Sequence, residues 1–248
     1  MNPISISFSI SDNFSQHIAV LMTSILMNNA ASEFVFHILH RNITQDNQKL
    51  LSETGKRFGR CKVVFHKIDE SIFAAAKLPS VHISQETYYR LLLPKILLGE
   101  KRTIYLDADM LVYPGIDELW NEDLEGHACA AVYHCPFPEN LWIGASDSFM
   151  RKKQGYFNAG MILFNLNFIR CNKLENLPFE VLDRERDRIE YADQDVLNLA
   201  YCGKVKFISK RYNFTGKWGE EKDHKPVVIR HFASFSQKPW NCKLTRLS

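Results

Sequence analysis

The N-terminal part of the chain switches repeatedly between two hydrophobic periods, and this constrains the fold more than any other feature of the sequence. Apolar residues recur at every second position from Ile4 to Ile10, with serines between them, which predicts a strand. Helical spacing follows over residues 15–28, then a second strand at 34–39, a polar helix at 44–58 and a third strand near 62–65. Strands that alternate with helices indicate an α/β domain with a mostly parallel sheet.

Further short, β-rich apolar runs continue this pattern through the rest of the chain. They lie at residues 103–106, 128–133, 161–164, 205–208 and 227–229. Residues 136–154 combine Pro, Gly and Ser with two large aromatic residues, which is typical of a long functional loop. Because no internal repeat, low-complexity tract or linker interrupts the sequence, we expect one domain that spans residues 1–248.

The composition is that of an ordinary globular protein and indicates no particular partner. Hydrophobic residues make up 46% and charged residues 24% of the chain, and the formal net charge is +3. There is no run of five like charges and no basic stripe interleaved with aromatics, so we do not expect nucleic-acid binding. No apolar run approaches the roughly 20 residues of a membrane-spanning helix. The six cysteines form no CxxC pair, which fits a reduced, cytoplasmic protein without a zinc site.

Sheets of this kind bind ligands beyond the carboxyl ends of their strands, so polar residues at strand ends matter most. The turn after the first strand, residues 11–15, contains no glycine. Both the dinucleotide-binding fingerprint and the phosphate-binding P-loop need glycines at such a turn. We therefore expect neither a nicotinamide dehydrogenase nor a P-loop NTPase.

Two carboxylates, Asp107 and Asp109, directly follow the apolar run at 103–106. Residues at i and i+2 leave a strand on the same face, so these two negative charges are expected to lie close together. Their repulsion is relieved when a divalent cation lies between them, which makes the pair a candidate metal site. A solvated turn after a strand is the alternative interpretation of this motif.

An imidazole, His231, stands at the end of the last predicted strand, and Lys238 follows it shortly. A lone histidine in such a place is commonly a hydrogen-bonded structural residue. If it joins the two carboxylates, the mixed oxygen and nitrogen ligands favour Mn²⁺ over Mg²⁺, because imidazole suits transition metals better. Lys238 could then hold a diphosphate as a point charge.

Two further segments lie between the carboxylates and the histidine. In Tyr156–Gly160 a glycine beside a small residue permits close approach of the backbone to a ligand just before a strand, although a tight turn explains it equally well. Asp193, Gln194 and Asp195 precede a helical run at 196–201, where acidic residues are also good capping chemistry.

Together, these segments in this order resemble glycosyltransferase family 8, the retaining UDP-sugar enzymes that include glycogenin and bacterial lipopolysaccharide galactosyl- and glucosyltransferases. The resemblance covers nearly the whole chain. It includes Ser11-Asp12-Asn13, the segment from Glu86 to Leu91, and the sequences YLDAD, YFNAG, YADQD and HxxxxxxKPW. The chain departs from the family where Ser11 replaces a second acidic residue, and where His231-Phe232-Ala233-Ser234 replaces a His-x-x-Gly pattern.

The resemblance implies a GT-A type nucleotide-diphospho-sugar transferase fold and a role for each matching residue. The metal ligands would be Asp107, Asp109 and His231. The donor would be bound by Asp12 and Asn13 at the uridine, by Lys238 at the diphosphate, and by Arg90, Asn158, Asp193 and Gln194 around the sugar. Further donor-binding residues would be Asp107, Ala159 and Gly160. Gln194 would lie nearest the anomeric carbon, with Asp193 as its catalytic partner.

The function implied by this resemblance is metal-dependent, retaining transfer of galactose or glucose from UDP-galactose or UDP-glucose to a saccharide acceptor, in lipopolysaccharide or other surface glycan synthesis. Mn²⁺ is the expected ion and Mg²⁺ the alternative. A metal-dependent nucleotide or sugar-phosphate hydrolase and a non-catalytic nucleotide-sugar-binding domain are the competing hypotheses. We expect a cytoplasmic protein without a transmembrane segment, with peripheral association at the inner face of the cytoplasmic membrane left open. No oligomeric state is indicated.

Overall fold

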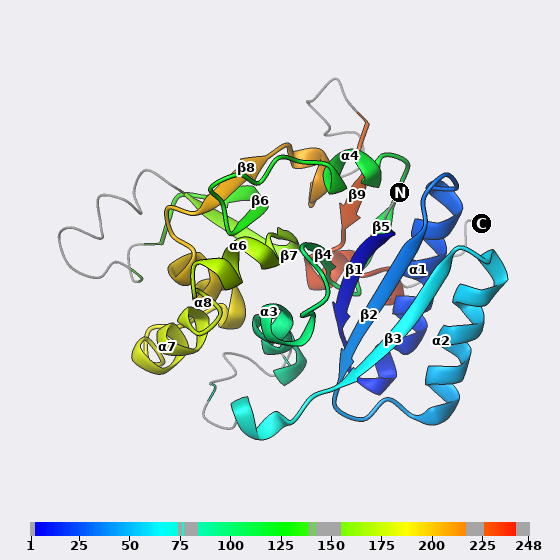
Figure 1. The fold of residues 1–248 in the computed structure, drawn as a ribbon, viewed down its shortest axis with the longest axis horizontal. Coiled ribbons are helices and arrows are strands. Elements are labelled where there is room, and N and C mark those ends of the chain that lie inside the picture. Colours follow the sequence, from blue (N-terminus) through cyan, green and yellow to red (C-terminus); the bar gives the residue numbers. More distant parts are fainter. Residues whose placement is uncertain are drawn as a thin grey trace.

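A computed structural model describes residues 3–73, 76, 84–138, 141, 155–216 and 226–241 (Figure 1). A seven-stranded sheet in the order β3-β2-β1-β4-β7-β6-β8 forms its centre. The strands are β1 (Ile4–Ser9), β2 (Phe34–His40), β3 (Cys61–Lys67), β4 (Thr103–Leu106), β6 (Cys129–Cys135), β7 (Tyr156–Phe164) and β8 (Val205–Ile208). Only β7 runs against its neighbours β4 and β6 among these strands, so the predicted mostly parallel sheet is confirmed.

Helices cover both faces of the sheet, and each face has its own hydrophobic core. One core is closed by α1 (Ser15–Asn28), α2 (Gln45–Phe58) and α4 (Ile116–Trp120). The other is closed by the 3-10 helix η3 (Gln85–Leu92) and by α3 (Leu93–Ile96), α6 (Leu166–Cys171), α7 (Leu177–Arg184) and α8 (Ala192–Ala200). Figure 1 shows α1 and α2 side by side next to β1, β2 and β3, with α6, α7 and α8 grouped at the other end of the sheet.

A small second sheet places the C-terminal part of the chain beside the end of β4. It consists of β5 (Met110–Val112) and β9 (Ile229–His231), which pair antiparallel with Met110 opposite His231. The short 3-10 helices are η1 (Asp12–Phe14), η2 (Glu70–Phe73), η5 (Lys210–Tyr212), η6 (Phe235–Gln237) and η7 (Pro239–Asn241).

The predicted elements agree closely with the structure in the N-terminal half. Helix α1 and strands β4 and β8 have the predicted bounds. Helix α2 follows its local sequence, because Thr44 accepts a hydrogen bond from the Asn47 amide at its start and Gly59 ends it in the left-handed conformation, with φ 65°. Strand β1 lies inside the sheet, so the face that carries its serines is buried as well as its apolar face. On that face the Ser5 hydroxyl donates a hydrogen bond to the Thr103 hydroxyl at 3.0 Å.

Two predicted strands near the site have different bounds in the structure. Strand β7 begins at Tyr156 rather than at residue 161, and β9 covers Ile229–His231 rather than 227–229. Pairing with β6 extends β7, and pairing with β5 shifts β9. The sequence alone does not show which strands pair. The predicted loop at 136–154 lies largely outside the described residues. Among the described residues no helix is long and apolar enough to cross a membrane.

Candidate active site

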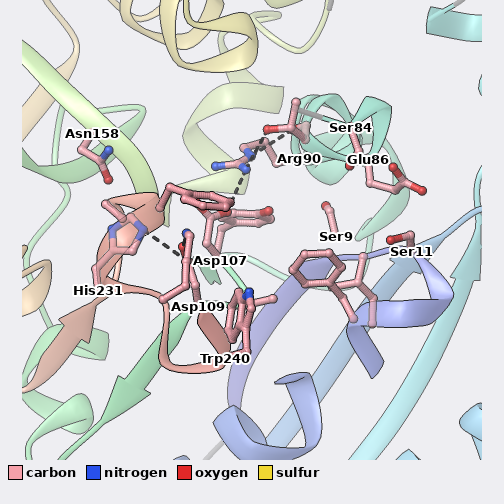
Figure 2. A pocket seen from close by; sticks show the side chains of 18 of the residues that line it. Ser9, Ser11, Ser84, Glu86, Arg90, Asp107, Asp109, Asn158, His231 and Trp240 are labelled. Carbon is pink, nitrogen blue, oxygen red and sulfur yellow. Dashed lines mark hydrogen bonds and ion pairs between the residues drawn. The ribbon is translucent and has the colours of Figure 1, made fainter. Parts of the chain in front are cut away.

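A cavity of about 570 Å³ lies beyond the carboxyl ends of β1 and β4 (Figure 2). Polar side chains from distant parts of the chain meet there, which is the place where a sheet of this topology binds its ligands. Six of the predicted site residues line it: Arg90, Asp107, Asp109, Asn158, His231 and Lys238.

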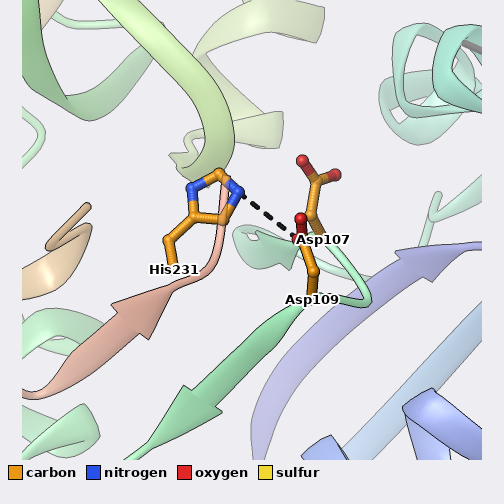
Figure 3. A group of neighbouring side chains, drawn as sticks. All are labelled: Asp107, Asp109 and His231. Atoms are coloured by element: carbon orange, nitrogen blue, oxygen red, sulfur yellow. Dashed lines mark ion pairs between the residues drawn. The ribbon is translucent and has the colours of Figure 1, made fainter. Parts of the chain in front are cut away.

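The turn between β4 and β5 carries two carboxylates to the wall of this cavity. One ligand atom each from Asp107, Asp109 and His231 lies within 4.8 Å of the others (Figure 3). The backbone fixes this arrangement, because the Asp107 amide donates to the Gly160 carbonyl and the Phe232 amide donates to the Asp109 carbonyl, each at 2.9 Å. The three predicted metal ligands are therefore brought together.

These residues fit a divalent cation. The Asp109 carboxylate is buried, and its Oδ1 has no hydrogen-bond partner among the described residues, although His231 Nε2 approaches it to 3.3 Å. The other oxygen contacts the Lys238 ammonium group. Burial alone would raise the pKa of Asp109, but His231 and Lys238 hold it at about 2, so the carboxylate is ionised at neutral pH. A buried carboxylate oxygen without a donor, facing an imidazole nitrogen, matches the ligands that Mn²⁺ prefers.

Arg90 connects two carboxylates, those of Asp107 and Asp193. Its guanidinium donates to Asp107 Oδ1 at 2.8 Å and forms an ion pair with Asp193 Oδ2 at 2.9 Å. It also donates to the Ala159 carbonyl at 2.5 Å and stacks 4.1 Å above the Tyr105 ring. The resemblance predicts that Arg90 lies next to the donor sugar. In the structure, most N–H groups of the Arg90 guanidinium contact other protein groups.

Asp193 is buried at the start of α8 and does not line the cavity. Its Oδ1 accepts a hydrogen bond from the Thr87 hydroxyl at 2.5 Å. Burial raises the pKa of Asp193 to about 6, against the lowering effect of Arg90. The preceding residue, Ala192, has a φ of 49°, a conformation that residues other than glycine adopt rarely.

Gln194 lies half-buried beside β7. Its side-chain carbonyl accepts hydrogen bonds from the Ala159 backbone amide and from the Asn158 side chain, both at 3.0 Å. Its amide nitrogen donates to the Tyr156 hydroxyl at 3.0 Å, which in turn donates to Asp195 at 2.5 Å. The Gln194 side chain is thus held by partners at both ends.

Gly160 approaches a protein group rather than an open ligand site. A methyl group added at its Cα would lie 2.4 Å from Cε1 of His231, so the imidazole occupies the space that a larger residue would fill. From the sequence, we expect a glycine that lets the backbone approach a ligand just before a strand. The predicted position before a strand is wrong, since Gly160 lies inside β7. The predicted contact of Gly160 with the donor stays a prediction.

Asp12 and Asn13 lie beside the cavity but do not line it. Asp12 Oδ1 accepts hydrogen bonds from the Thr44 backbone amide at 2.8 Å and from the Asn47 side chain at 2.9 Å, at the start of α2. The hydrogen bond from Asn47, followed by that from Thr44, lowers the pKa of Asp12. Asn13 accepts from the Ser11 hydroxyl at 2.6 Å. Their predicted contacts with uridine stay predictions.

Aromatic side chains without an assigned role in the sequence form the other side of the cavity. The Trp240 ring stacks on His17 with 3.9 Å between centroids, and Phe14 meets Trp240 edge-on at 6.0 Å. Trp240 follows Lys238 in the sequence, so this stack anchors the segment whose ammonium group contacts Asp109. Phe14 directly follows Asp12 and Asn13 at the end of the first strand, and this position in the sequence indicates that its ring lies near the site.

The sequence matches the family described as glycosyl transferase family 8 over residues 5–243. The chain belongs to glycosyltransferase family 8. A Haemophilus influenzae protein named "Putative glycosyltransferase" is 30% identical, with 99% of this chain and 75% of that protein covered. The lipopolysaccharide 1,3-galactosyltransferase of Salmonella typhimurium is 28% identical, over 84% of this chain and 62% of its own length. The family and these relatives support a glycosyltransferase that acts in glycan synthesis.

A solved structure shows the fold of this chain. The galactosyltransferase LgtC, crystallised in complex with donor and acceptor sugar analogs, superposes with a TM-score of 0.81 at 24% identity. The superposition covers 96% of this family 8 chain and 89% of LgtC. The predicted GT-A fold is therefore confirmed.

Proposed function

We propose that this chain transfers a hexose, galactose or glucose, from a UDP-sugar to a saccharide acceptor with retention of anomeric configuration. The meeting of Asp107, Asp109 and His231 at the cavity is the observation that carries this proposal. Named relatives act on lipopolysaccharide, such as the 1,2-glucosyltransferase of Escherichia coli, which is 26% identical over 95% of this chain and 73% of its own length. We therefore place the reaction in lipopolysaccharide or other surface glycan synthesis, within a single domain over residues 1–248.

Mn²⁺ is the proposed cofactor, with Mg²⁺ as the alternative, and Asp107, Asp109 and His231 would hold it. When bound, the cation offsets negative charge on the departing UDP. Lys238 would hold the diphosphate as a point charge beside this group. Arg90 would orient Asp107 and Asp193 through its ion pairs with both carboxylates.

The contacts of the two buried aspartates support transfer without a covalent glycosyl intermediate. Asp195 accepts hydrogen bonds on both oxygens, from the Tyr156 hydroxyl and from the backbone amides of Glu190 and Tyr191. Asp193 is held by Thr87 on one oxygen and by Arg90 on the other. A nucleophilic attack by either carboxylate would break buried hydrogen bonds or ion pairs, which is costly.

We therefore favour front-face substitution, in which the leaving diphosphate takes the acceptor's proton on the face where the new bond forms. Gln194 would lie nearest the anomeric carbon and stabilise developing positive charge through its amide dipole. Asp193 would orient the sugar hydroxyls.

A panel of UDP-sugars tests the proposal, with release of free UDP measured in the presence and absence of saccharide acceptors. We expect release from UDP-galactose or UDP-glucose, faster with acceptor, and a product of retained anomeric configuration by NMR. Equal release without any acceptor would support the competing hydrolase. Absence of both binding and release across the panel would favour a non-catalytic domain. A hexose adduct on Asp193 or Asp195, found by mass spectrometry of enzyme quenched during turnover, would contradict the front-face mechanism.

A further inference from the structure

Asn213 is a buried residue that contacts the candidate metal ligand His231. Its side-chain Oδ1 lies 2.8 Å from Nδ1 of the imidazole, and the residue is only 5% exposed. Asn213 directly follows η5 and lies outside the sequence segments that predict metal or donor binding. Its side-chain nitrogen donates to Asn158 Oδ1 at 2.9 Å, so Asn213 joins the candidate metal group to β7.

Two backbone amides determine the orientation of the amide side chains in this region. A backbone N–H can only donate, so the atom that it meets must be an oxygen. The Gly160 amide meets Asn158 Oδ1 at 3.1 Å, and the Ala159 amide meets Gln194 Oε1 at 3.0 Å. Since Asn158 Oδ1 is an acceptor, the Asn213 atom facing it must be the nitrogen. The other Asn213 atom, the oxygen, therefore faces His231.

This orientation fixes the tautomer of the imidazole. Because Asn213 presents an oxygen, Nδ1 of His231 must carry the proton and donate it. In the neutral imidazole, Nε2 is then the unprotonated nitrogen, and this nitrogen faces Asp109 Oδ1. A metal-ligating histidine needs a lone pair on the nitrogen that faces the ion and a hydrogen-bond acceptor for the other nitrogen. Asn213 supplies that acceptor.

The same contacts form a directed chain of hydrogen bonds. His231 donates to Asn213, Asn213 to Asn158, and Asn158 to Gln194. Gln194 then donates to the Tyr156 hydroxyl, and Tyr156 donates to Asp195. Every donor in this chain points towards the same carboxylate. Hydrogen bonds in such a chain polarise one another, and one reversed amide would leave a buried donor or acceptor unsatisfied.

We propose that Asn213 is a positioning residue with two separable tasks: it holds His231 as the Nδ1-protonated tautomer, and it orients Asn158 and through it Gln194. The first task requires the side-chain oxygen of Asn213, which accepts from His231. The second task requires its side-chain nitrogen, which donates to Asn158. The inference deepens the proposed function, since it assumes that His231 binds a metal and that Gln194 serves the transfer.

Two substitutions separate these tasks. Asn213→Ala removes both the acceptor and the donor. Asn213→Asp keeps an acceptor for His231 but removes the donor to Asn158. The matched control is Asn29→Asp, because Asn29 is similarly buried, accepts from the Gly115 and Ile116 amides, and lies outside the cavity. Thermal denaturation of the control shows the cost of a buried Asn-to-Asp change by itself.

Electron paramagnetic resonance of Mn²⁺, titrated with protein at saturating UDP, measures metal affinity apart from turnover. Loss of a group that holds a ligating histidine typically weakens metal binding by about 10- to 100-fold, and we expect this for Asn213→Ala. We expect Asn213→Asp to bind Mn²⁺ within about threefold of the wild type, yet to have a kcat at least about tenfold lower at little-changed KM. Wild-type Mn²⁺ affinity and kcat in Asn213→Ala would overturn the proposal, as would equal losses of Mn²⁺ affinity in both variants.

Nitrogen-15 NMR of histidine in the metal-free protein tests the tautomer directly. We expect the His231 ring to be protonated at Nδ1 in the wild type and to lose this preference in Asn213→Ala. A neutral ring protonated at Nε2 alone in the wild type would overturn the inference whether or not the proposed function holds. If the wild type binds no Mn²⁺ with UDP but shows the Nδ1 tautomer, the proposed function fails instead.

Discussion

The backbone amide of Ala159 donates a hydrogen bond to the side-chain carbonyl of Gln194, with 3.0 Å between nitrogen and oxygen. A second bond, from Asn158, reaches the same oxygen. Both lone pairs of that carbonyl are thereby engaged, so the Gln194 side chain has one orientation. We infer that it acts on the donor sugar as a fixed dipole rather than as a nucleophile, which agrees with front-face substitution.

Gln194→Ala tests this role. The substitution removes the amide dipole and the acceptor of the Asn158 side chain, so we expect kcat to fall by roughly ten- to a thousandfold, or about 1.4 to 4 kcal/mol. Affinity for the UDP-sugar should change little. Steady-state kinetics and calorimetry measure the two quantities, and Gln48→Ala on α2, which loses a single bond to the Ile43 carbonyl, is the control. A rise in KM with unchanged kcat would assign Gln194 to ground-state binding.

Lys238→Ala tests the proposed diphosphate contact. The ammonium group contacts Asp109, and Trp240 anchors its segment against His17. We expect affinity for UDP to fall by about 1.5 to 3 kcal/mol, typical of a charge-assisted hydrogen bond, and affinity for uridine to stay nearly constant. Calorimetry with both ligands measures the difference. Equal losses for UDP and uridine would mean that Lys238 supports the fold, and Lys206→Ala, which breaks an ion pair with Glu122, controls for lost charge.

Gly160→Ala should damage the candidate metal group while leaving its three ligands in the sequence. The added methyl would lie 2.4 Å from the His231 ring, so the imidazole must move. We expect a loss of about 1 to 3 kcal/mol in unfolding free energy and Mn²⁺ binding weaker by at least about tenfold. Gly99→Ala is the matched control, because an added Cβ there meets nothing within 4 Å. Unchanged Mn²⁺ binding in Gly160→Ala would show that His231 is not a ligand.

The stability of the fold should decrease below neutral pH because of a histidine far from the cavity. Burial, with smaller effects of His66 and Lys62, lowers the pKa of His37 from 6.5 to about 4. Between these values the unfolded chain takes up a proton that the native protein does not, so unfolding becomes easier as the pH falls. We expect protonation of His37 to account for a loss of about 2 kcal/mol between pH 7 and pH 5, measured by urea denaturation as the difference between the wild type and a His37 variant.

The variant His37→Gln can still hydrogen-bond to His66, whose Nε2 lies 3.0 Å from His37 Nδ1 in the native protein. It should lack the contribution of His37 to the pH dependence. An unchanged pH dependence in His37→Gln would assign the effect to another group.

The hydrophobic periods predict the N-terminal half of the fold because each element there is specified locally. Helix α1 has its predicted bounds, and α2 carries its own cap in Thr44 and its own stop in Gly59. Strands β7 and β9 depend on distant partners instead. The shift of β9 by two residues results from its pairing with β5, a strand of three residues without a clear period of its own.

The candidate site is predictable where a motif supplies the functional atom itself. Asp107, Asp109 and His231 belong to recognisable segments, and they meet in the structure. Asn213 and Tyr156 could not be assigned roles in the same way, because they act through other side chains. Their importance depends on which amide faces which backbone N–H, and only three-dimensional contacts determine that.

Calorimetric titration of UDP into the protein, with Mn²⁺ or with a chelator, tests the central claim most directly. Asp107, Asp109 and His231 offer a cation a buried carboxylate oxygen and an imidazole nitrogen beside the cavity. We predict that the wild type binds UDP tightly with Mn²⁺ and at least about tenfold more weakly with chelator, and that Asp109→Ala shows the weak affinity in both conditions. Equally tight binding of UDP by the wild type with chelator present would contradict the account.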